Sequence, residues 1–306
     1  MQVDIISLGE AMVEFNQTRS GTTYEAGFGG DTSNCAVAAA RQGARVGYMS
    51  AVGSDAFGDL LINMWAEEGI DTESVNRNAN APTGIYFVTH SADGHHFTYY
   101  RKGSAASLMT PDQIPADAIR SARILHISAI SQAISETACD AVFTAIKIAK
   151  EAGVTVSYDT NLRLALWPLE RATAIINRTV ELSDIILPGL EDAQALTGLA
   201  DPDAIVDAYL SRGVGTVALT MGEQGALIAT GSERRLLAPH QVDCIDATGA
   251  GDTFDGAFLA RIAAGDEVFD AAVYANAAAA LSTTGFGAIA SIPMPDAVRA
   301  MIAVSR

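Results

Sequence analysis

The stretch Asp246-Ala247-Thr248-Gly249-Ala250-Gly251-Asp252-Thr253-Phe254 places a carboxylate inside a glycine-rich turn. Apolar residues then recur at helical spacing up to Ile262, so the stretch predicts a helix whose first turn is Gly249 to Asp252. Backbone N–H groups in a first helical turn lack partners within the helix, and the helix dipole makes them favour an anion such as a transferring phosphoryl group. Asp252 would lie beside that phosphate as a general base. Alternatively, Asp252 and Thr253 only cap the helix.

A second glycine turn leads into another predicted helix at Gly29-Gly30-Asp31-Thr32-Ser33-Asn34. The two glycines allow a sharp bend and the close approach of a ligand, and the Asn34 amide offers both donors and an acceptor to sugar hydroxyls. Taken alone, the stretch is explained equally well by a helix cap at Asp31 or Thr32.

Together the two stretches resemble the paired signatures of the ribokinase-like sugar kinases, also called the phosphofructokinase B family. These signatures are GG-x-x-x-N near the amino terminus and D-T/A-x-G-A-G-D near the carboxyl terminus, and their order and separation match here over essentially the whole chain. The resemblance implies in-line phosphoryl transfer from ATP, with magnesium bridging the nucleotide phosphates. Asp252 would accept the hydroxyl proton, and the N–H groups of Gly249, Ala250 and Gly251 would stabilise the phosphoryl oxygens.

The composition sets the class of protein. With 306 residues, 49% of them hydrophobic, the chain can bury a large core. A net charge of −17 argues against a nucleic-acid or acidic-membrane partner, because phosphate contacts require clustered Lys and Arg. It also makes any arginine near the site a stronger functional candidate.

The cysteines and the amino-terminal segment indicate the compartment. Cys35, Cys139 and Cys244 are odd in number, widely spaced and without metal-ligand spacing, so we expect them to be reduced and buried in a cytoplasmic protein. Met1 to Ile6 lacks a basic region and no apolar stretch approaches membrane length, which predicts a protein that is neither secreted nor inserted.

Short apolar runs alternate with helical patterns along the chain, which predicts an α/β fold with a mostly parallel sheet covered by helices on both faces. Ligands gather beyond the carboxyl ends of the strands in such sheets. The predicted strands are 3–8, 46–52, 124–128, 154–158, 184–187, 216–220 and 226–229. The predicted helices are 32–42, 56–68, 136–151, 168–182, 202–212, 249–264, 267–282 and 295–304.

Two segments break this alternation. Residues 12–15 with 22–28, and a hairpin of 84–90 and 95–101 around Asp93-Gly94, read as antiparallel strands. The resemblance implies that such strands form a small antiparallel β lid over the sugar and often mediate dimerisation. The expected division is therefore a core of residues 1–10, 28–81 and 107–306 and a lid of 11–27 and 82–106, with a homodimer or higher homo-oligomer. The lid residues could instead pack on the main core.

The nucleotide site lacks the usual glycine signatures, since the sequence has neither a Walker A motif nor a G-x-G-x-x-G. Thr220-Met221-Gly222-Glu223-Gln224-Gly225 resembles the family's T-x-G-x-x-G loop near the ATP phosphates and ribose. Thr220, Gly222 and Gly225 are therefore expected to bind ATP, together with Asn161 and Arg163; a plain hairpin turn is the alternative.

Two stretches bear on metal ions. Pro188-Gly189-Leu190-Glu191 lies where most of the family has N-x-x-E; Pro188 replaces the asparagine, which leaves Glu191 as the expected magnesium-side carboxylate, or as a helix N-terminal acid. Asp246 and Thr248, with Gly287 and Ser291, resemble the loop that binds a monovalent cation such as potassium in several members.

The substrate class is indicated by two arginines, Arg101 in Tyr99-Tyr100-Arg101 and Arg163 in Asp159-Thr160-Asn161-Leu162-Arg163. A guanidinium suits a carboxylate or a phosphate bidentately, whereas a neutral sugar requires only hydroxyl partners. With Gly30 and Tyr86, the pattern most resembles the family's kinases of 2-keto-3-deoxygluconate, which implies that Tyr99, Arg101 and Arg163 contact a sugar acid.

Three alternatives stay open for the substrate side. Arg101 could be a solvated hairpin end. The enzyme could be a neutral-sugar kinase of the fructokinase or ribokinase type. A non-catalytic sugar- or nucleotide-binding regulator would retain Gly30 and Asn34 but lose the base, and the presence of Asp252 disfavours it.

Overall fold

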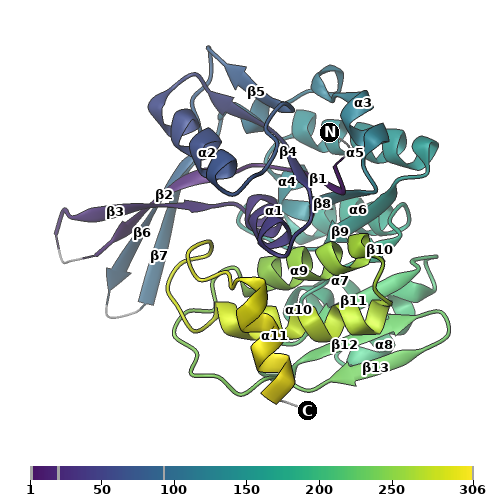
Figure 1. Ribbon diagram of the computed structural model, residues 1–306. Coiled ribbons are helices and arrows are strands. Elements are labelled where there is room, and N and C mark those ends of the chain that lie inside the picture. Colours follow the sequence, from purple (N-terminus) through teal and green to yellow (C-terminus); the bar gives the residue numbers. More distant parts are fainter. Residues whose placement is uncertain (1–2, 19–20, 92–93, 305–306) are drawn as a thin grey trace.

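The protein is built around one large sheet with a smaller sheet projecting from its side (Figure 1). A computed structural model describes residues 3–18, 21–91 and 94–304 of the chain. In this part of the chain, the predicted mostly parallel sheet with helices on both faces is confirmed.

The large sheet has the strand order β13-β12-β11-β10-β9-β8-β1-β4-β5. All neighbours from β11 to β5 run parallel, and β12 and β13 add an antiparallel edge. The central β1 is buried along its whole length because helices cover both of its faces. The strands are β1 (Ile5–Leu8), β4 (Val46–Gly53), β5 (Val75–Asn78), β8 (Ile124–Ser128), β9 (Thr155–Asp159), β10 (Ile185–Ile186), β11 (Thr216–Thr220), β12 (Ala226–Thr230) and β13 (Arg234–Leu237).

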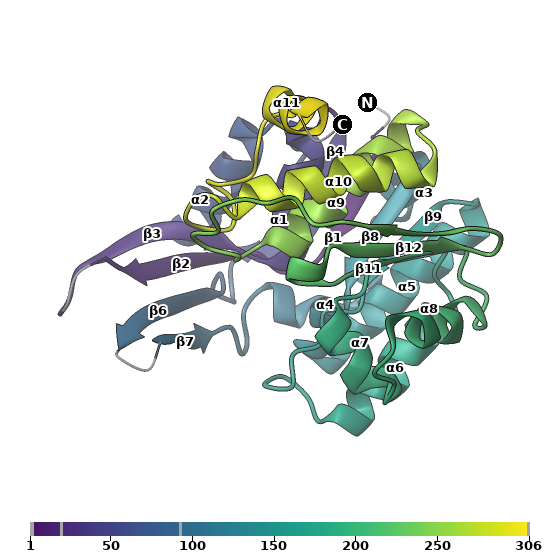
Figure 2. The same ribbon diagram turned by 90° about the horizontal axis from the view of Figure 1, so that it is seen from below.

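Helices pack on the two faces as separate layers (Figure 2). One apolar cluster joins the sheet to α1 (Asp31–Arg41), α2 (Ala56–Glu67), α9 (Ala250–Ala264), α10 (Val268–Ser282) and α11 (Pro295–Val304). A second cluster joins the opposite face to α3 (Ala116–Ser121), α4 (Ala129–Ala133), α5 (Glu136–Ala152), α6 (Leu169–Val180), α7 (Leu190–Thr197) and α8 (Pro202–Leu210).

Helices α1 and α9 pack unusually closely, and Gly256 is the reason. A Cβ at this position would lie 2.3 Å from the Cys35 carbonyl oxygen and 2.6 Å from Ala38 Cβ. Because the absent side chain lets the two backbones approach, the amino ends of α1 and α9 come together at one edge of the sheet.

The small sheet has the order β3-β2-β6-β7 and comprises β2 (Met12–Gln17), β3 (Tyr24–Gly29), β6 (Ile85–Ser91) and β7 (Gly94–Tyr100). Its two outer pairs are antiparallel as predicted, whereas β2 and β6 in the middle run parallel. The predicted turn at Asp93-Gly94 lies partly outside the described residues, since Asp93 is not among them.

Several elements were not predicted, among them β5, β13, α3 and the short α7. Each is short or has a mixed burial pattern, so hydrophobic periodicity gives a weak signal there. Cys35 and Cys139 are buried, as predicted. The prediction for Cys244 is wrong: it is exposed, because residues 238–247 cross the surface without helix or strand. Among the described residues, no helix has the length and apolar character needed to cross a membrane.

Candidate active site

The site begins at two helix amino ends that glycines hold in place. Gly30 precedes α1 with φ 130°, and Gly249 precedes α9 with φ 75°, both in the region that favours glycine. A Cβ on Gly30 would lie 2.5 Å from the Glu10 carbonyl oxygen. A Cβ on Gly29 would lie 2.2 Å from the Tyr86 hydroxyl. The Gly-Gly pair thus lets α1 begin directly against the end of β1 and beneath the small sheet.

The predicted base and the predicted sugar-binding amide meet across 218 residues of sequence. Asn34 Nδ2 donates to Asp252 Oδ2 at 2.8 Å. Desolvation, together with repulsion from Asp31, raises the pKa of Asp252 to about 7, although the Asn34 hydrogen bond and the charge of Arg163 act to lower it. A carboxylate with a pKa close to neutral is well matched to general-base chemistry at cellular pH.

The first turn of α9 offers backbone donors beside this carboxylate. Thr253 N–H already donates to Gly249 O at 2.8 Å, and Ala250 N–H donates to Ala247 O at 3.2 Å. The N–H groups of Gly251 and Asp252 have no acceptor within the described residues. An anion in front of the turn would satisfy these two donors, whereas the predicted contact from Ala250 would compete with the turn's own bond.

Buried polar groups that were not predicted as site residues lie behind the predicted base, and one of them is Asp31, which the sequence offered only as a helix cap. Asp31 Oδ2 accepts from the Ser128 hydroxyl and from Asn161 Nδ2 at 3.3 Å, which joins α1 to the ends of β8 and β9. Asp159 and Asp255 are also buried, and desolvation plus the nearby carboxylates raises the pKa of each well above its usual range. The raised pKa values favour the neutral carboxyls, which would limit the negative charge presented to a phosphate. Asp255 was detectable in principle, because it lies one helical turn after Asp252.

The loop after β9 is anchored by a residue next to the one predicted. Asp192 Oδ2, at the start of α7, accepts from Leu162 N–H at 2.8 Å and lies 3.8 Å from Arg163 Nη1. Desolvation raises the pKa of Asp192. Glu191 is exposed on the same turn. Both carboxylates therefore lie at the edge of the sheet where a hydrated cation beside nucleotide phosphates would find oxygen ligands.

The predicted nucleotide loop follows β11 at the same edge. Thr220 N–H donates to Pro188 O at 2.9 Å, which places Pro188 in a backbone contact where an asparagine was expected from the family signature. Gly222 has φ 55° and Gly225 φ 87°, and a Cβ on Gly225 would lie 2.0 Å from the Leu237 carbonyl oxygen. The glycines thus shape an exposed turn of backbone beyond the carboxyl end of a parallel strand, a position that can receive a nucleotide.

The predicted cation loop is brought together by side-chain hydrogen bonds. Asp246 Oδ1 accepts from Thr248 N–H and Oγ1, and Asp246 Oδ2 accepts from Gly287 N–H at 3.0 Å. Ser291 Oγ donates to Gly287 O at 2.6 Å. The loop therefore connects the turn before α9 with the segment after α10.

The residues predicted for the acceptor side lie on the small sheet and at the end of β1. Tyr86 is buried and donates to Glu14 Oε2 at 2.5 Å, and burial raises the pKa of its phenol further above its usual range. Tyr99, on the neighbouring β7, packs beside Tyr86 with the ring centroids 5.5 Å apart and the rings tilted by 31°. The Arg101 guanidinium lies 5.8 Å from the Tyr99 ring and pairs with the buried carboxylate of Glu10, an interaction that the sequence did not predict.

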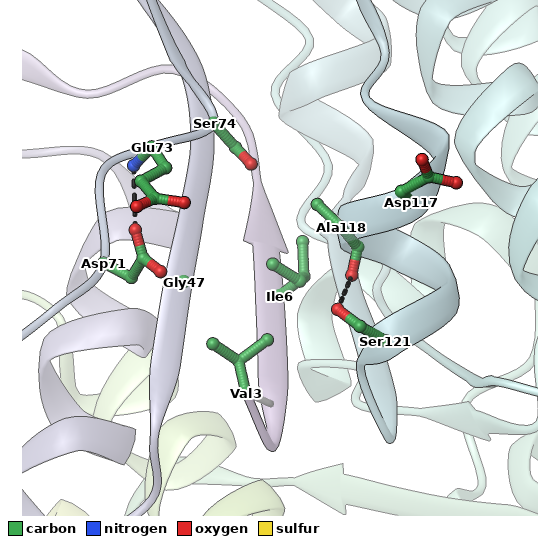
Figure 3. A pocket seen from close by; sticks show the side chains of 9 residues that line it. All are labelled: Val3, Ile6, Gly47, Asp71, Glu73, Ser74, Asp117, Ala118 and Ser121. Atoms are coloured by element: carbon green, nitrogen blue, oxygen red, sulfur yellow. Dashed lines mark hydrogen bonds between the residues drawn. The ribbon is translucent and has the colours of Figure 1, made fainter. Parts of the chain in front are cut away.

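A cavity of about 540 Å³ lies elsewhere, at the amino ends of β1 and β4 (Figure 3). Val3 and Ile6 form its apolar floor, and Asp71, Glu73 and Asp117 make its lining acidic. No lysine or arginine lines it in the described chain, so it suits neither a nucleotide phosphate nor a sugar acid.

A buried carboxyl whose pKa is raised to about 7, beside unsatisfied donors at a helix amino end on a doubly covered parallel sheet, is the arrangement expected of a phosphotransferase with an alcohol acceptor. The chain belongs to the pfkB family of carbohydrate kinases, because the sequence model of that family matches residues 2–295. The predicted family, its ribokinase-like fold and its enzymatic class are thereby confirmed.

Curated relatives differ in the sugar they are named for. The chain is 34% identical to a 2-dehydro-3-deoxygluconokinase of Bacillus subtilis, with 100% of this chain and 97% of the relative covered. It is also 34% identical to fructokinase-2 of Solanum lycopersicum, over 94% of this chain and 93% of the relative. A Vibrio cholerae fructokinase in fructose, ADP and calcium ion bound form superposes with a TM-score of 0.88 at 29% identity, covering 98% of this chain and 99% of the other.

Proposed function

We propose that the protein is an ATP-dependent kinase of a sugar acid, and that its acceptor is 2-keto-3-deoxygluconate, phosphorylated on the terminal hydroxyl. The observation that carries this proposal is the pair of guanidinium groups on the acceptor side. Arg163 is about half exposed and close enough to Asp252 to lower the pKa of that carboxyl. Arg101 is held on the same side by the buried carboxylate of Glu10, with Nη2 2.5 Å from Oε2. A carboxylate would give these guanidinium groups a further directed, charge-assisted partner that a neutral sugar lacks.

The roles of the remaining residues follow from their positions. Asp252 takes the acceptor's hydroxyl proton while Asn34 orients the carboxylate, and the N–H groups of the α9 turn, chiefly of Gly251, face the transferred phosphoryl oxygens. Gly30, Tyr86 and Tyr99 enclose the sugar. We assign the nucleotide to Asn161, Arg163 and the loop of Thr220, Gly222 and Gly225.

Metal ions enter this proposal as partners of the nucleotide. Magnesium, when bound, neutralises phosphate charge, and Glu191 and Asp192 are the carboxylates placed to hold its water shell. A potassium ion would take oxygen ligands from the loop of Asp246, Thr248 and Ser291. Because Asp246 already accepts from Thr248 and Gly287, such an ion would depend mainly on backbone carbonyls.

A neutral-sugar kinase is the second candidate function, favoured by the similarity to a named fructokinase. An ADP-release assay over a panel of sugars and sugar acids separates the two candidates. We expect 2-keto-3-deoxygluconate to give the highest kcat/KM. A preference of the wild-type protein for fructose or ribose over every sugar acid would overturn the assigned substrate and leave the carbohydrate kinase assignment intact.

Asp252→Asn provides the catalytic control for that assay. The substitution keeps size but removes the base, so turnover should fall by about 10²–10⁴-fold while ATP binding hardly changes. The pKa of Asp252 is raised from 3.8 to about 7 in the folded state, so between these pH values the folded protein binds more protons than the unfolded chain. The stability that the neutral carboxyl allows at low pH is therefore lost as the pH rises through about 7. At pH 8 the variant should therefore melt no lower than wild type, which separates lost chemistry from lost folding.

A further inference from the structure

Glu10 is a fully enclosed carboxylate at the carboxyl end of β1. Its side chain is 0% exposed. Oε2 accepts from Arg101 Nε at 2.7 Å and lies 2.5 Å from Arg101 Nη2, and Oε1 accepts from Ser104 Oγ at 2.5 Å. The residue thus joins the central strand of the core to the segment that leaves the small sheet after β7.

Glu10 is closely packed against two glycines, neither of which could carry a side chain without a clash. A Cβ on Gly84, just before β6, would lie 2.9 Å from Glu10 Oε1. A Cβ on Gly30 would strike the Glu10 carbonyl oxygen at 2.5 Å. Glu10 is therefore packed against the glycine turn of α1 on one side and the start of the hairpin on the other, and it cannot turn away from Arg101 without repacking both.

Arg101 is held by this contact in an almost dry position. Its side chain is 12% exposed, and the guanidinium lies against the Tyr99 ring on the acceptor side of the small sheet. Both Nε and Nη2 face Glu10, yet Nη2 has no acceptor in hydrogen-bonding geometry among the described residues. The charge of Arg101 is largely compensated by Glu10, and Nη2 is buried against that carboxylate.

We propose that Glu10 is a positioning and specificity-determining residue, which fixes the Arg101 guanidinium toward the acceptor and sets how strongly the pocket attracts a carboxylate. The inference rests on the proposed function in placing the acceptor beside Arg101. Glu10 does not touch the acceptor; it acts through Arg101. A pocket with the Glu10–Arg101 pair has almost no net charge from these two groups and recognises a sugar acid by directed hydrogen bonds rather than by bulk attraction.

Removing the charge of one member of such a pair leaves the charge of the other uncompensated. Glu10→Gln keeps the shape and removes the compensating charge, so the pocket becomes more positive and Arg101 less firmly oriented. We expect 2-keto-3-deoxygluconate to bind about tenfold more tightly, because one negative charge that repels its carboxylate is removed. Turnover should fall about tenfold, because a less firmly oriented Arg101 holds the hydroxyl of the bound acid less accurately for phosphoryl transfer. A residue with a purely structural role would weaken binding and turnover together.

Arg101→Ala alone is an ambiguous probe for the same reason. It leaves the Glu10 carboxylate buried without its cation, so lower stability and repulsion of the acid add to the lost contact. The double variant Glu10→Gln/Arg101→Ala removes both charges. It should melt at a higher temperature than Arg101→Ala and bind the acid about tenfold more tightly than that single variant.

The experiment measures dissociation constants of 2-keto-3-deoxygluconate and fructose by calorimetry, and kcat by ADP release, for wild type, Glu10→Gln, Arg101→Ala and the double variant. Glu68→Gln is the matched control, because Glu68 also forms a partly buried ion pair, with Arg41 at 2.6 Å, but at the far ends of α1 and α2. The control should leave affinity for the acid unchanged even where its melting temperature falls.

Tighter acid binding with slower turnover in Glu10→Gln, and no comparable gain for fructose, supports the inference. Weaker acid binding in Glu10→Gln, or an equal change for acid and fructose, overturns it. If Glu10→Gln does not fold, the comparison of the double variant with Arg101→Ala decides, and no gain in acid affinity there overturns the inference. A wild-type preference for fructose would instead refute the proposed substrate, and the predicted gain in acid affinity would still be measurable.

Discussion

At the scale of single residues, the site depends on one carboxylate whose protonation is set by its neighbours. Asp252 receives one side-chain hydrogen bond, from Asn34, and lies in the fields of Asp31 and Arg163. Burial and Asp31 favour the neutral form, whereas Asn34 and Arg163 favour the anion that can accept a proton. The four influences together leave the pKa near 7, so small changes in this environment move the base across the working pH.

This balance predicts that kcat/KM, the rate constant that governs turnover at low substrate concentration, depends on pH. Only the deprotonated base is active, so kcat/KM should rise with pH through a midpoint near 7 and level off above it. Asn34→Ala removes the hydrogen bond that stabilises the anion, and the midpoint should move to higher pH. A pH–rate profile of both proteins measures the shift.

Asn276→Ala is a suitable control for that profile, because the Asn276 amide on α10 donates to Ala238 O and not to Asp252. Its midpoint should match that of wild type. A wild-type profile that stays flat between pH 5 and 8, or an Asn34→Ala midpoint at lower pH, would contradict the assignment of Asp252 as the titrating base.

At the scale of secondary-structure elements, the critical contact is the close packing of α1 on α9. Gly256 brings α9 against the backbone of Cys35 and Ala39, and this approach allows Asn34 on α1 to reach Asp252 on α9. The length of the Asn34–Asp252 hydrogen bond therefore depends on the spacing of the two helices. The same packing explains why α9 is apolar and buried for most of its length.

Gly256→Ala tests this dependence. The new Cβ would meet backbone atoms at 2.3 Å and 2.8 Å, so the helices must separate, and we expect a loss of about 1–3 kcal/mol in the free energy of unfolding. Turnover should fall as well, because the Asn34–Asp252 contact lengthens. Urea denaturation and the ADP-release assay measure the two effects. Gly231→Ala, at a surface position with open space, should change neither; a wild-type rate in Gly256→Ala would show that the spacing is not critical.

The sequence predicted those elements whose signal is local. The stretch from Gly249 to Asp252 predicted a helix start and a base, and the structure has α9 beginning at Ala250 with Asp252 in its first turn. The pairing of Glu10 with Arg101 could not be predicted in this way, because 91 residues separate them and either residue alone is a common type. The hydrogen bond from Leu162 N–H to Asp192 could not be predicted either, because every residue except proline has a backbone N–H and the sequence does not show which one a carboxylate binds.

At the scale of the whole molecule, the small sheet stands beside the carboxyl edge of the large one, attached through β2, β3 and the segments around Gly84 and Arg101 (Figure 1). Its acceptor-side aromatic residues are only partly covered, with Phe97 50% and Tyr99 49% exposed. A sheet attached at its base and exposed along β7 has the form expected of a lid that closes on substrate. Its free face is where we expect a second copy of the chain to dock.

The lid hypothesis predicts a change in hydrogen exchange. Backbone amides of β6 and β7 should exchange more slowly when 2-keto-3-deoxygluconate is present at saturating concentration, whereas those of β12 and β13 at the far edge of the large sheet should not change. Mass spectrometry of peptic fragments resolves the two regions. Equal exchange in β6 and β7 with and without the sugar acid would mean that these strands are fixed scaffold.

The 218 residues between Asn34 and Asp252 also govern when the enzyme can work during its own synthesis. A nascent chain that has emerged as far as β13 already contains the small sheet, the Gly29-Gly30 turn and both arginines of the acceptor side. It has no base until α9 leaves the ribosome and docks on α1. With Asp252 as the base, catalysis requires α9 to be synthesised and docked on α1, and a chain interrupted before Gly249 should be inert however well its first half has folded.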